Sequence, residues 1–436
     1  MLKKSITSDV GFRVPKMNHK TLDILFSITL FILTLLFIYQ TSFFHTDTLS
    51  ALYMLVLLGI SLLYQYLRMK KLRKQSLYLA IFLFVDILPN IIYQNQPFLK
   101  MVNFLFFNII YAYWFLDCGN HLIKEKESDW IINDILHAIL HAPFHYLSTS
   151  FQLFKSAFPF KFNDSLKILL GLCFSIPLLF LIIPLLMRAD NMFAYYIEQI
   201  HFDEEFIFRW LMTLFFTFPL FFYYLSLSYG NIAHQSISLY QEDIMLQRRK
   251  RLCFLPSTIC TTIELVLCAT YFLFFIAGIQ GIISSMGMNR DVFSFSDFAR
   301  QGFFELCVIA TLNLTIIIMI NVTSEYRTQF AIWVERCLII LTVLLVLCAM
   351  TKLYLYISAY DALTYLRMYA AWFLCLLLGV FLLLLFRKKD GTPHILWITR
   401  FVMAAFLILN LINVPHWVNN SYDETAPYTI KEYHEE

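Results

Sequence analysis

The feature that most constrains this chain is a series of long apolar stretches. An α-helix needs about 20 predominantly apolar residues to cross the hydrocarbon layer of a membrane. Stretches of that kind lie at residues 21–39, 49–67, 77–93, 99–116, 167–187, 206–227, 256–283, 303–322, 332–356, 366–386 and 394–412. They predict an all-α integral membrane protein with about eleven transmembrane helices.

The composition supports the same fold class. Of the 436 residues, 59% are hydrophobic and only 14% are charged, whereas soluble domains carry about 25% charged residues. Even large soluble domains leave about a quarter of the surface of the unfolded chain exposed, so a water-soluble fold could not hide this much apolar surface. A soluble globular protein is therefore excluded.

The basic residues predict the orientation. Most Lys and Arg residues of the connections fall on the side of the N-terminus, and few fall on the opposite side. By the positive-inside rule, the N-terminus is cytoplasmic and the C-terminus is external. The predicted segments are a cytoplasmic stretch at 1–20, four transmembrane helices in 21–117, a cytoplasmic connection at 118–166, a seven-helix region at 167–413 and an external acidic tail at 414–436.

The cytoplasmic side carries two features that predict contact with lipid. Apolar residues between Trp130 and Leu140 recur at helical spacing, with Asp134 and His137 among the polar residues between them, which is typical of an amphipathic helix in the membrane interface. Four consecutive basic residues, Arg248, Arg249, Lys250 and Arg251, precede a membrane entry. Such a cluster attracts anionic lipid, although it could equally serve only as a topology signal. The net charge of +3 is too small to indicate a nucleic-acid partner.

Charged side chains also occur at the predicted outer boundary of the membrane. The candidate polar pocket consists of Arg300, Glu305, Lys352, Tyr356 and Arg367. Lys352 and Tyr356 are four residues apart and share one helix face. Charges at this depth need partners or a cavity. The set could be a structural network, or it could be a site open to the outside that binds a lipid headgroup or an anionic solute.

The same region carries the motifs of a family. The order Phe-Ser-x-Phe-Ala-Arg-x-Gly-Phe-Phe-Glu-Leu at 295–306, Leu-Tyr-Ile-x-x-Tyr at 355–360, Leu-Thr-x-x-Arg at 363–367 and Trp-Phe at 372–373 resembles a bacterial multi-pass membrane family known as a domain of unknown function of the 4173/4153 type. Ala-Asp-x-x-Phe at 189–193 is similar to a further motif of that family. Where relatives read Tyr-Gly-Leu-Thr, this chain has Tyr-Asp-Ala-Leu-Thr at 360–364. The resemblance implies a protein of the bacterial cytoplasmic membrane, and it supplies no activity and no catalytic residue.

A second candidate site would hold a metal. Asp134, His137 and His141 are spaced three and four residues apart, on one stripe of a helix. Two His residues four apart on a helix can chelate a metal, and the carboxylate would add a third ligand. Pro143 is expected to bend or end this helix before His145. The other interpretation is a set of interfacial histidines with no ligand role.

The chain lacks the motifs of several enzyme classes. HExxH, Walker A, GxSxG and GxGxxG are absent from the sequence, and the nine cysteines form no CxxC pair. We therefore expect no cofactor, and the absence of these motifs favours a protein without catalytic activity over an enzyme.

Three functions remain open. The first is a non-enzymatic scaffold or signalling component of the envelope with an unidentified protein partner. The second is a permease-like transporter of a small anionic solute or lipid, for which prolines inside the spans (Pro177, Pro184 and Pro219) could break helices beside a cavity. The third is an enzyme acting on lipid-linked substrates, with Glu305 as acid or base. A cavity reaching the middle of the membrane would favour transport, whereas a solid core of Leu and Phe would favour the scaffold.

Overall fold

The structure is a computed structural model. It describes residues 21–43, 48–69, 73–92, 97–124, 127–157, 204–233, 242–285, 302–324, 327–360, 364–386 and 394–412, with residues 414 and 418 and a discontinuous set between 171 and 195. The predicted segment 1–20, nearly all of the predicted tail and many residues of the predicted span 167–187 lie outside this part of the chain.

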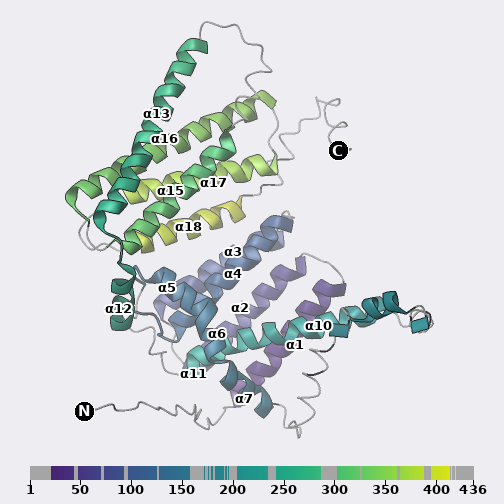
Figure 1. Cartoon of the computed structure of the whole chain (residues 1–436). Helices are drawn as coiled ribbons and strands as arrows, with labels where there is room; N and C mark the ends of the chain where they lie inside the picture. The colour runs from purple at the N-terminus through teal and green to yellow at the C-terminus, as the bar shows by residue number, and fades with distance from the viewer. Residues whose placement is uncertain are drawn as a thin grey trace. The chain divides into compact units, whose positions relative to one another are not determined.

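The described part of the chain is helical (Figure 1). Within it, ten helices are long and apolar enough to cross a membrane. They are Thr21–Thr41, Leu49–Met69, Lys74–Ile92, Phe98–Cys118, Met212–Gly230, Ser257–Gly278, Phe303–Thr323, Gln329–Ser358, Tyr365–Leu385 and His394–Leu411. The prediction of an all-α, multi-pass membrane architecture is thus confirmed, while the orientation of the termini stays a prediction.

The helices form two compact units that interleave along the sequence. Unit 1 comprises residues 1–84, 108–121 and 135–235, and unit 2 comprises residues 85–107, 122–134 and 236–436. Helices α3 (Lys74–Ile92) and α4 (Pro97–Cys118) contribute residues to both. The contiguous segments inferred from the sequence stay a prediction.

Unit 1 is built around α1 (Thr21–Phe43). This helix packs against α2 (Thr48–Met69), α7 (Leu147–Ala157) and α10 (Glu204–Leu225). Large aromatic side chains fill the contacts: the ring of Phe26 stacks on Tyr64, and that of Phe37 on Tyr53, each with centroids 4.0 Å apart. Trp114 on α4 is fully buried. Aromatic packing of this kind suits a chain with only 11 glycines, which has few small residues for close backbone contact.

Two short π-helical turns interrupt the helices of unit 1. The first, His137–His141, lies between α5 (Ile131–Leu136) and α6 (Ala142–His145), and the second, Ser226–Gly230, lies between α10 and α11 (Asn231–Ala233). A Cβ placed on Gly230 would lie 2.4 Å from the ring of Tyr146, so only glycine allows this approach. Wide turns of this type often mark functional or strained points of a helix.

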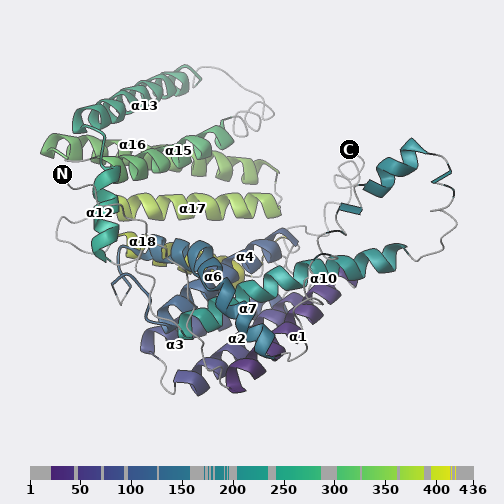
Figure 2. The same ribbon diagram turned by 60° about the horizontal axis from the view of Figure 1, so that its bottom comes forward.

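Unit 2 is a row of helices packed on α16 (Gln329–Tyr360). Helices α13 (Ser257–Ser285), α15 (Phe303–Thr323) and α17 (Tyr365–Leu385) contact α16, and α18 (His394–Leu411) packs on α17 (Figures 1 and 2). Their shared core contains Leu338, Leu345, Val346, Leu374 and Phe381, all buried.

The outward faces of these helices are apolar as well. Phe272 on α13, Phe304 on α15 and Trp333 on α16 are each more than half exposed. A helix that is apolar on both its packed and its open sides is stable only where lipid replaces water. The exposed surface therefore supports the membrane assignment independently of helix length.

Candidate functional site

The candidate polar pocket lies in unit 2, where α15, α16 and α17 begin or end. Arg300 falls outside the described residues. Glu305 is exposed in the first turn of α15, and Lys352 and Tyr356 are partly buried on α16. Arg367 stands in the first turn of α17. Four of the five residues thus lie on three helices that pack together.

The structure brings two of these residues into direct contact. The guanidinium carbon of Arg367 lies 4.3 Å from the centre of the Tyr356 ring, which is a cation–π pair. Arg367 is also held by its backbone, because its N–H donates to the hydroxyl of Thr364, the N-cap of α17, over 3.4 Å. The cation–π contact and the cap together fix the start of α17 against α16.

Lys352 lies beside the beginning of α15. Gly302 precedes that helix with a φ of 83°, and a Cβ placed on it would lie 3.1 Å from the Nζ atom of Lys352. A positive φ is costly for residues with a Cβ. The sequence analysis had singled out the Arg300–Glu305 stretch around this glycine, and the structure gives the glycine a conformational reason.

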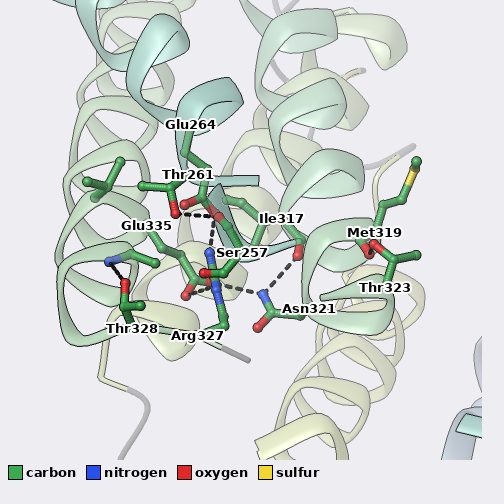
Figure 3. A network of polar contacts seen from close by, with 12 residues as sticks. Ser257, Thr261, Glu264, Ile317, Met319, Asn321, Thr323, Arg327, Thr328 and Glu335 are labelled. Carbon is green, nitrogen blue, oxygen red and sulfur yellow. Dashed lines mark hydrogen bonds and ion pairs between the residues drawn. The ribbon is translucent and has the colours of Figure 1, made fainter. Parts of the chain in front are cut away.

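A separate charge network joins α13, α15 and α16 at the end of α15 and near the beginnings of α13 and α16 (Figure 3). Arg327, in the link between α15 and α16, donates from Nη2 to Oε1 of Glu264 on α13 over 2.5 Å and from Nη1 to Oε2 of Glu335 on α16. Asn321 on α15 donates to the other oxygen of Glu335 over 2.6 Å. The Glu264 side chain is fully buried, and the side chain of Arg327 is only 14% exposed.

The backbone supports the same network. The N–H of Leu255, just before α13, donates to the carbonyl of Thr323 at the end of α15 over 3.1 Å. The beginning of α13, the end of α15 and the beginning of α16 therefore meet at one place. Two buried carboxylates share one guanidinium there, and this arrangement holds α13 and α16 together.

Sequence reasoning missed the role of Arg327. None of Arg327, Glu264 and Glu335 was singled out from the sequence. The available signal was that two carboxylates in apolar stretches require a cation. Arg327 is the basic residue in the short link between the ends of two of these helices.

Unit 1 shows the same use of charge. The carboxylate of Asp23 on α1 accepts a hydrogen bond from the hydroxyl of Tyr64 over 2.9 Å and pairs with Arg68 over 3.3 Å, both on α2. Asp117 on α4 accepts from the hydroxyl of Ser76 on α3 over 2.5 Å. Buried carboxylates in both units thus bind neighbouring helices.

The candidate metal ligands take other partners. Asp134 is buried and its Oδ1 accepts from the backbone N–H of Ile123 over 3.0 Å; burial nonetheless raises the pKa of this carboxyl to about 7. The rings of His137 and His141 lie 5.9 Å apart in the π-helical turn. Burial and the neighbouring His141, His121 and His145 lower the pKa of His137 to about 3, so its ring is neutral.

No group of three or more His, Cys, Asp or Glu side chains in the described residues is arranged to hold a metal ion. The helix does not end before His145: Pro143 follows the π-helical turn and stands in the first turn of α6, which continues to His145. Because proline has no N–H to donate, a break in the α-helical hydrogen bonding is expected there.

The helical segment that carries these residues turns an apolar stripe outward. Ile132, Leu136, Leu140 and Phe144 follow one another at intervals of four and are each about half exposed or more. Asp134 and His137 are buried. An exposed apolar stripe beside a buried polar side agrees with a helix that lies in the membrane interface.

The comparison with known families decides the classification. The family described as Domain of unknown function (DUF4153) matches residues 25–422. The chain belongs to this family. The match confirms the resemblance seen in the motifs at 295–373, and it extends through the N-terminal helices, where the sequence motifs were not recognisable. No curated protein and no solved structure matched the chain.

Because DUF4153 is a domain of unknown function, membership of this family assigns no chemistry to the candidate sites. Their chemistry is argued from the residues present. Within the described part of unit 2, the Glu264–Arg327–Glu335 network joins helices. The pair of Tyr356 and Arg367 is a second interhelical contact of the same kind.

Proposed function

We propose that this DUF4153 protein is a non-enzymatic scaffold or signalling component of the bacterial envelope, and that its helices act on a partner protein. The observation that carries the proposal is the use of the membrane-embedded charges. Arg327 binds Glu264 and Glu335, and Arg68 binds Asp23. These ionisable groups therefore form ion pairs that hold helices together.

The packing of the two units supports the same function. The inward faces of α13, α15, α16 and α17 are filled by Leu, Val, Ile and Phe side chains. In unit 1 the rings of Tyr111, Trp114, Phe221 and Tyr224 are fully buried. A solid core of this kind favours a rigid assembly over a pathway for a solute.

The cytoplasmic basic cluster provides a docking element for such a scaffold. Helix α12 (Glu242–Leu252) is held through buried Met245 and through the ion pair of Glu242 with Lys124, whose atoms lie 2.9 Å apart. The four basic residues from Arg248 to Arg251 are exposed at its end. We expect them to bind anionic lipid headgroups, each charge contributing about 1 kcal/mol near a membrane surface.

The lipid contact is tested by charge reversal with a charge-conserving control. The variant Arg248→Glu/Arg249→Glu/Arg251→Glu should lose co-purified anionic lipid in nanodiscs of mixed composition. The variant with Lys at the same three positions should retain it, because it keeps the charge. Equal retention of lipid by both variants would contradict the contact.

The scaffold function is tested in native membranes. The tagged chain is extracted with its surrounding lipid in polymer nanodiscs and analysed by native mass spectrometry. We expect one protein to remain bound in a fixed ratio. The chain recovered alone, together with solute uptake when it is reconstituted in vesicles, would contradict the proposal.

One observation favours the transporter as a second candidate. Arg367 and Lys352 bring two cationic side chains toward the helix ends at Tyr356 and Gly302, and the N-terminus of α15 adds a positive dipole. A positive region of this kind suits an anionic solute or lipid headgroup. Uptake of an anion that is lost in Arg367→Gln but retained in Arg336→Gln would support this function.

A further inference from the structure

A second group of polar side chains is buried in unit 2, away from the sites described above. It consists of Asp86 and Asn90 on α3, Asn103 on α4 and Asn410 on α18. Their side chains are between 0% and 4% exposed. Each lies within a helix long and apolar enough to span the membrane. Such burial of four polar residues requires an explanation, because unsatisfied polar groups in a membrane are costly.

The amide nitrogens of this cluster donate to acceptors on Asp86 and on Asn103. Nδ2 of Asn410 donates to Oδ1 of Asp86 over 2.8 Å and to Oδ1 of Asn103 over 3.0 Å. Because a carboxylate only accepts hydrogen bonds, Asn410 must turn its nitrogen toward Asp86. Nδ2 of Asn90 and Nδ2 of Asn103 both point to the backbone carbonyl of Asp86, over 3.4 and 3.5 Å.

What remains in the cluster is a surplus of acceptors. All three amide nitrogens donate within it, whereas Oδ2 of Asp86, Oδ1 of Asn90 and Oδ1 of Asn410 are buried without a hydrogen-bond partner among the described residues. Each of these oxygens belongs to a side chain whose other polar atom is bonded inside the cluster. Asp86 forms no ion pair with Lys or Arg in the described part of the chain.

We propose that this cluster, the Asp86 site, binds a monovalent alkali cation. The unpartnered atoms are carboxylate and amide oxygens, which are the ligands that hard cations prefer. One carboxylate balances one positive charge, whereas sites for divalent cations usually contain more acidic ligands. A proton on Oδ2 of Asp86 would satisfy that oxygen and one amide oxygen, and it would leave the third acceptor unpartnered.

The position of the site fits binding from one side of the membrane. At a rise of 1.5 Å per residue, Asp86 lies about 9 Å from the end of α3 at Ile92, and Asn103 lies about 9 Å from the beginning of α4 at Pro97. Asn410 is the next-to-last residue of α18. The site is therefore closer to these helix ends than to the opposite ends of α3 and α4.

An apolar cluster covers the same helix ends. Leu99, Leu409, Val414 and Val418 are buried together, with Tyr369 and Trp372 of α17 among the side chains packed against them. A cation at the Asp86 site would be shielded from water by this cluster and would join α3, α4 and α18. We expect it to stabilise the folded state, whichever function the protein has.

The test compares the thermal stability of the purified full chain in NaCl, KCl and choline chloride at equal ionic strength. We expect the Tm to rise in a saturable manner with Na⁺ or K⁺ and not with choline. In Asn90→Ala the half-saturating concentration should rise at least tenfold. Asn90 forms only one long hydrogen bond, so this variant should still fold.

The matched control is Asn313→Ala. Asn313 is also a buried asparagine in a spanning helix, but both of its polar atoms are used: it donates to Thr342 over 2.9 Å and accepts from Tyr271 over 2.7 Å. Its loss should lower the Tm without changing the half-saturating concentration. The same Tm in all three salts would overturn the proposal. So would a Tm that depends on pH alone, which would assign the site to a proton, or an unchanged half-saturation in Asn90→Ala.

Discussion

The guanidinium of Arg327 lies 2.5 Å from a carboxylate oxygen of Glu264, although 63 positions separate the two residues in the sequence. The same guanidinium binds Glu335. One side chain in a short connection thus neutralises charge on two spanning helices. This relationship makes α13, α15 and α16 depend on one another.

Removal of the positive charge of Arg327 should destabilise unit 2 strongly. In Arg327→Met two buried carboxylates lose the cation that neutralises them, and breaking a buried pair typically costs about 3–5 kcal/mol. We expect a large fall in Tm and in membrane abundance. The control Arg336→Met removes a cation whose guanidinium carbon lies 5.6 Å from the centre of the Trp333 ring, and it should cost under about 1 kcal/mol. Similar losses in the two variants would contradict the clamp.

Substitution of Gly302 should disturb the start of α15. In Gly302→Ala the residue keeps an unfavourable positive φ, at a cost of about 1–2 kcal/mol, and its Cβ approaches the ammonium of Lys352. Gly302→Asn should be less harmful, because asparagine tolerates this conformation. Unfolding of both variants in detergent checks the order. Equal stability of the alanine and asparagine variants would argue against a conformational role.

The π-helical turn at Gly230 should tolerate no side chain. In Gly230→Ala the new Cβ would lie 2.4 Å from the ring of Tyr146, so one of the two segments must move. We expect a marked loss of stability, of the order of the 1–3 kcal/mol typical of overpacking. Gly59→Ala is the matched control, because nothing lies within 4 Å of a Cβ there. Thermal unfolding that ranks Gly59→Ala as the more harmful variant would contradict this geometry.

The connection at residues 118–166 should respond to pH in two opposite ways. Burial raises the pKa of Asp134 to about 7, so its contribution to stability falls as the pH rises from about 4 to 7. Burial lowers the pKa of His137 to about 3, so its contribution increases as the pH rises from about 3 to 6.5.

Single substitutions separate the two effects. Asp134→Asn should become more resistant to proteolysis of the connection as the pH rises from 4.5 to 6.5, and His137→Gln should become less resistant over the same range. Each slope is at most about 1.4 kcal/mol per pH unit. Parallel slopes in the two variants would show that these groups are not titrating as their burial requires.

The sequence predicted the long helices well. The stretch 303–322 corresponds to Phe303–Thr323, and 366–386 to Tyr365–Leu385, because an uninterrupted apolar run in lipid has few alternatives to a helix. The positions that sequence reasoning could not supply are contacts between helices. Asn410 donates to Asp86 across 324 positions, and such a pairing depends on how each helix is rotated and packed, which a single sequence does not reveal.

The candidate polar pocket stays a prediction. The sequence drew attention to Lys352 and Arg367 because charges near the ends of spans must find partners. The contact of Arg367 with the Tyr356 ring is seen only in the structure. The role of Arg327 could not be predicted, because the positive-inside rule treats every basic residue outside an apolar run alike. Its burial follows from the backbone pairing of Leu255 with Thr323, which brings the helix ends together.

We propose that the membrane-embedded charges build a rigid scaffold for a partner protein. Native mass spectrometry of the chain extracted with its own lipid is the sharpest test of this scaffold. We expect a complex with one further protein in a fixed ratio, and loss of that complex in Arg327→Met when the variant is compared at equal abundance. The chain found alone in both forms, with solute uptake that survives in Arg327→Met, would contradict it.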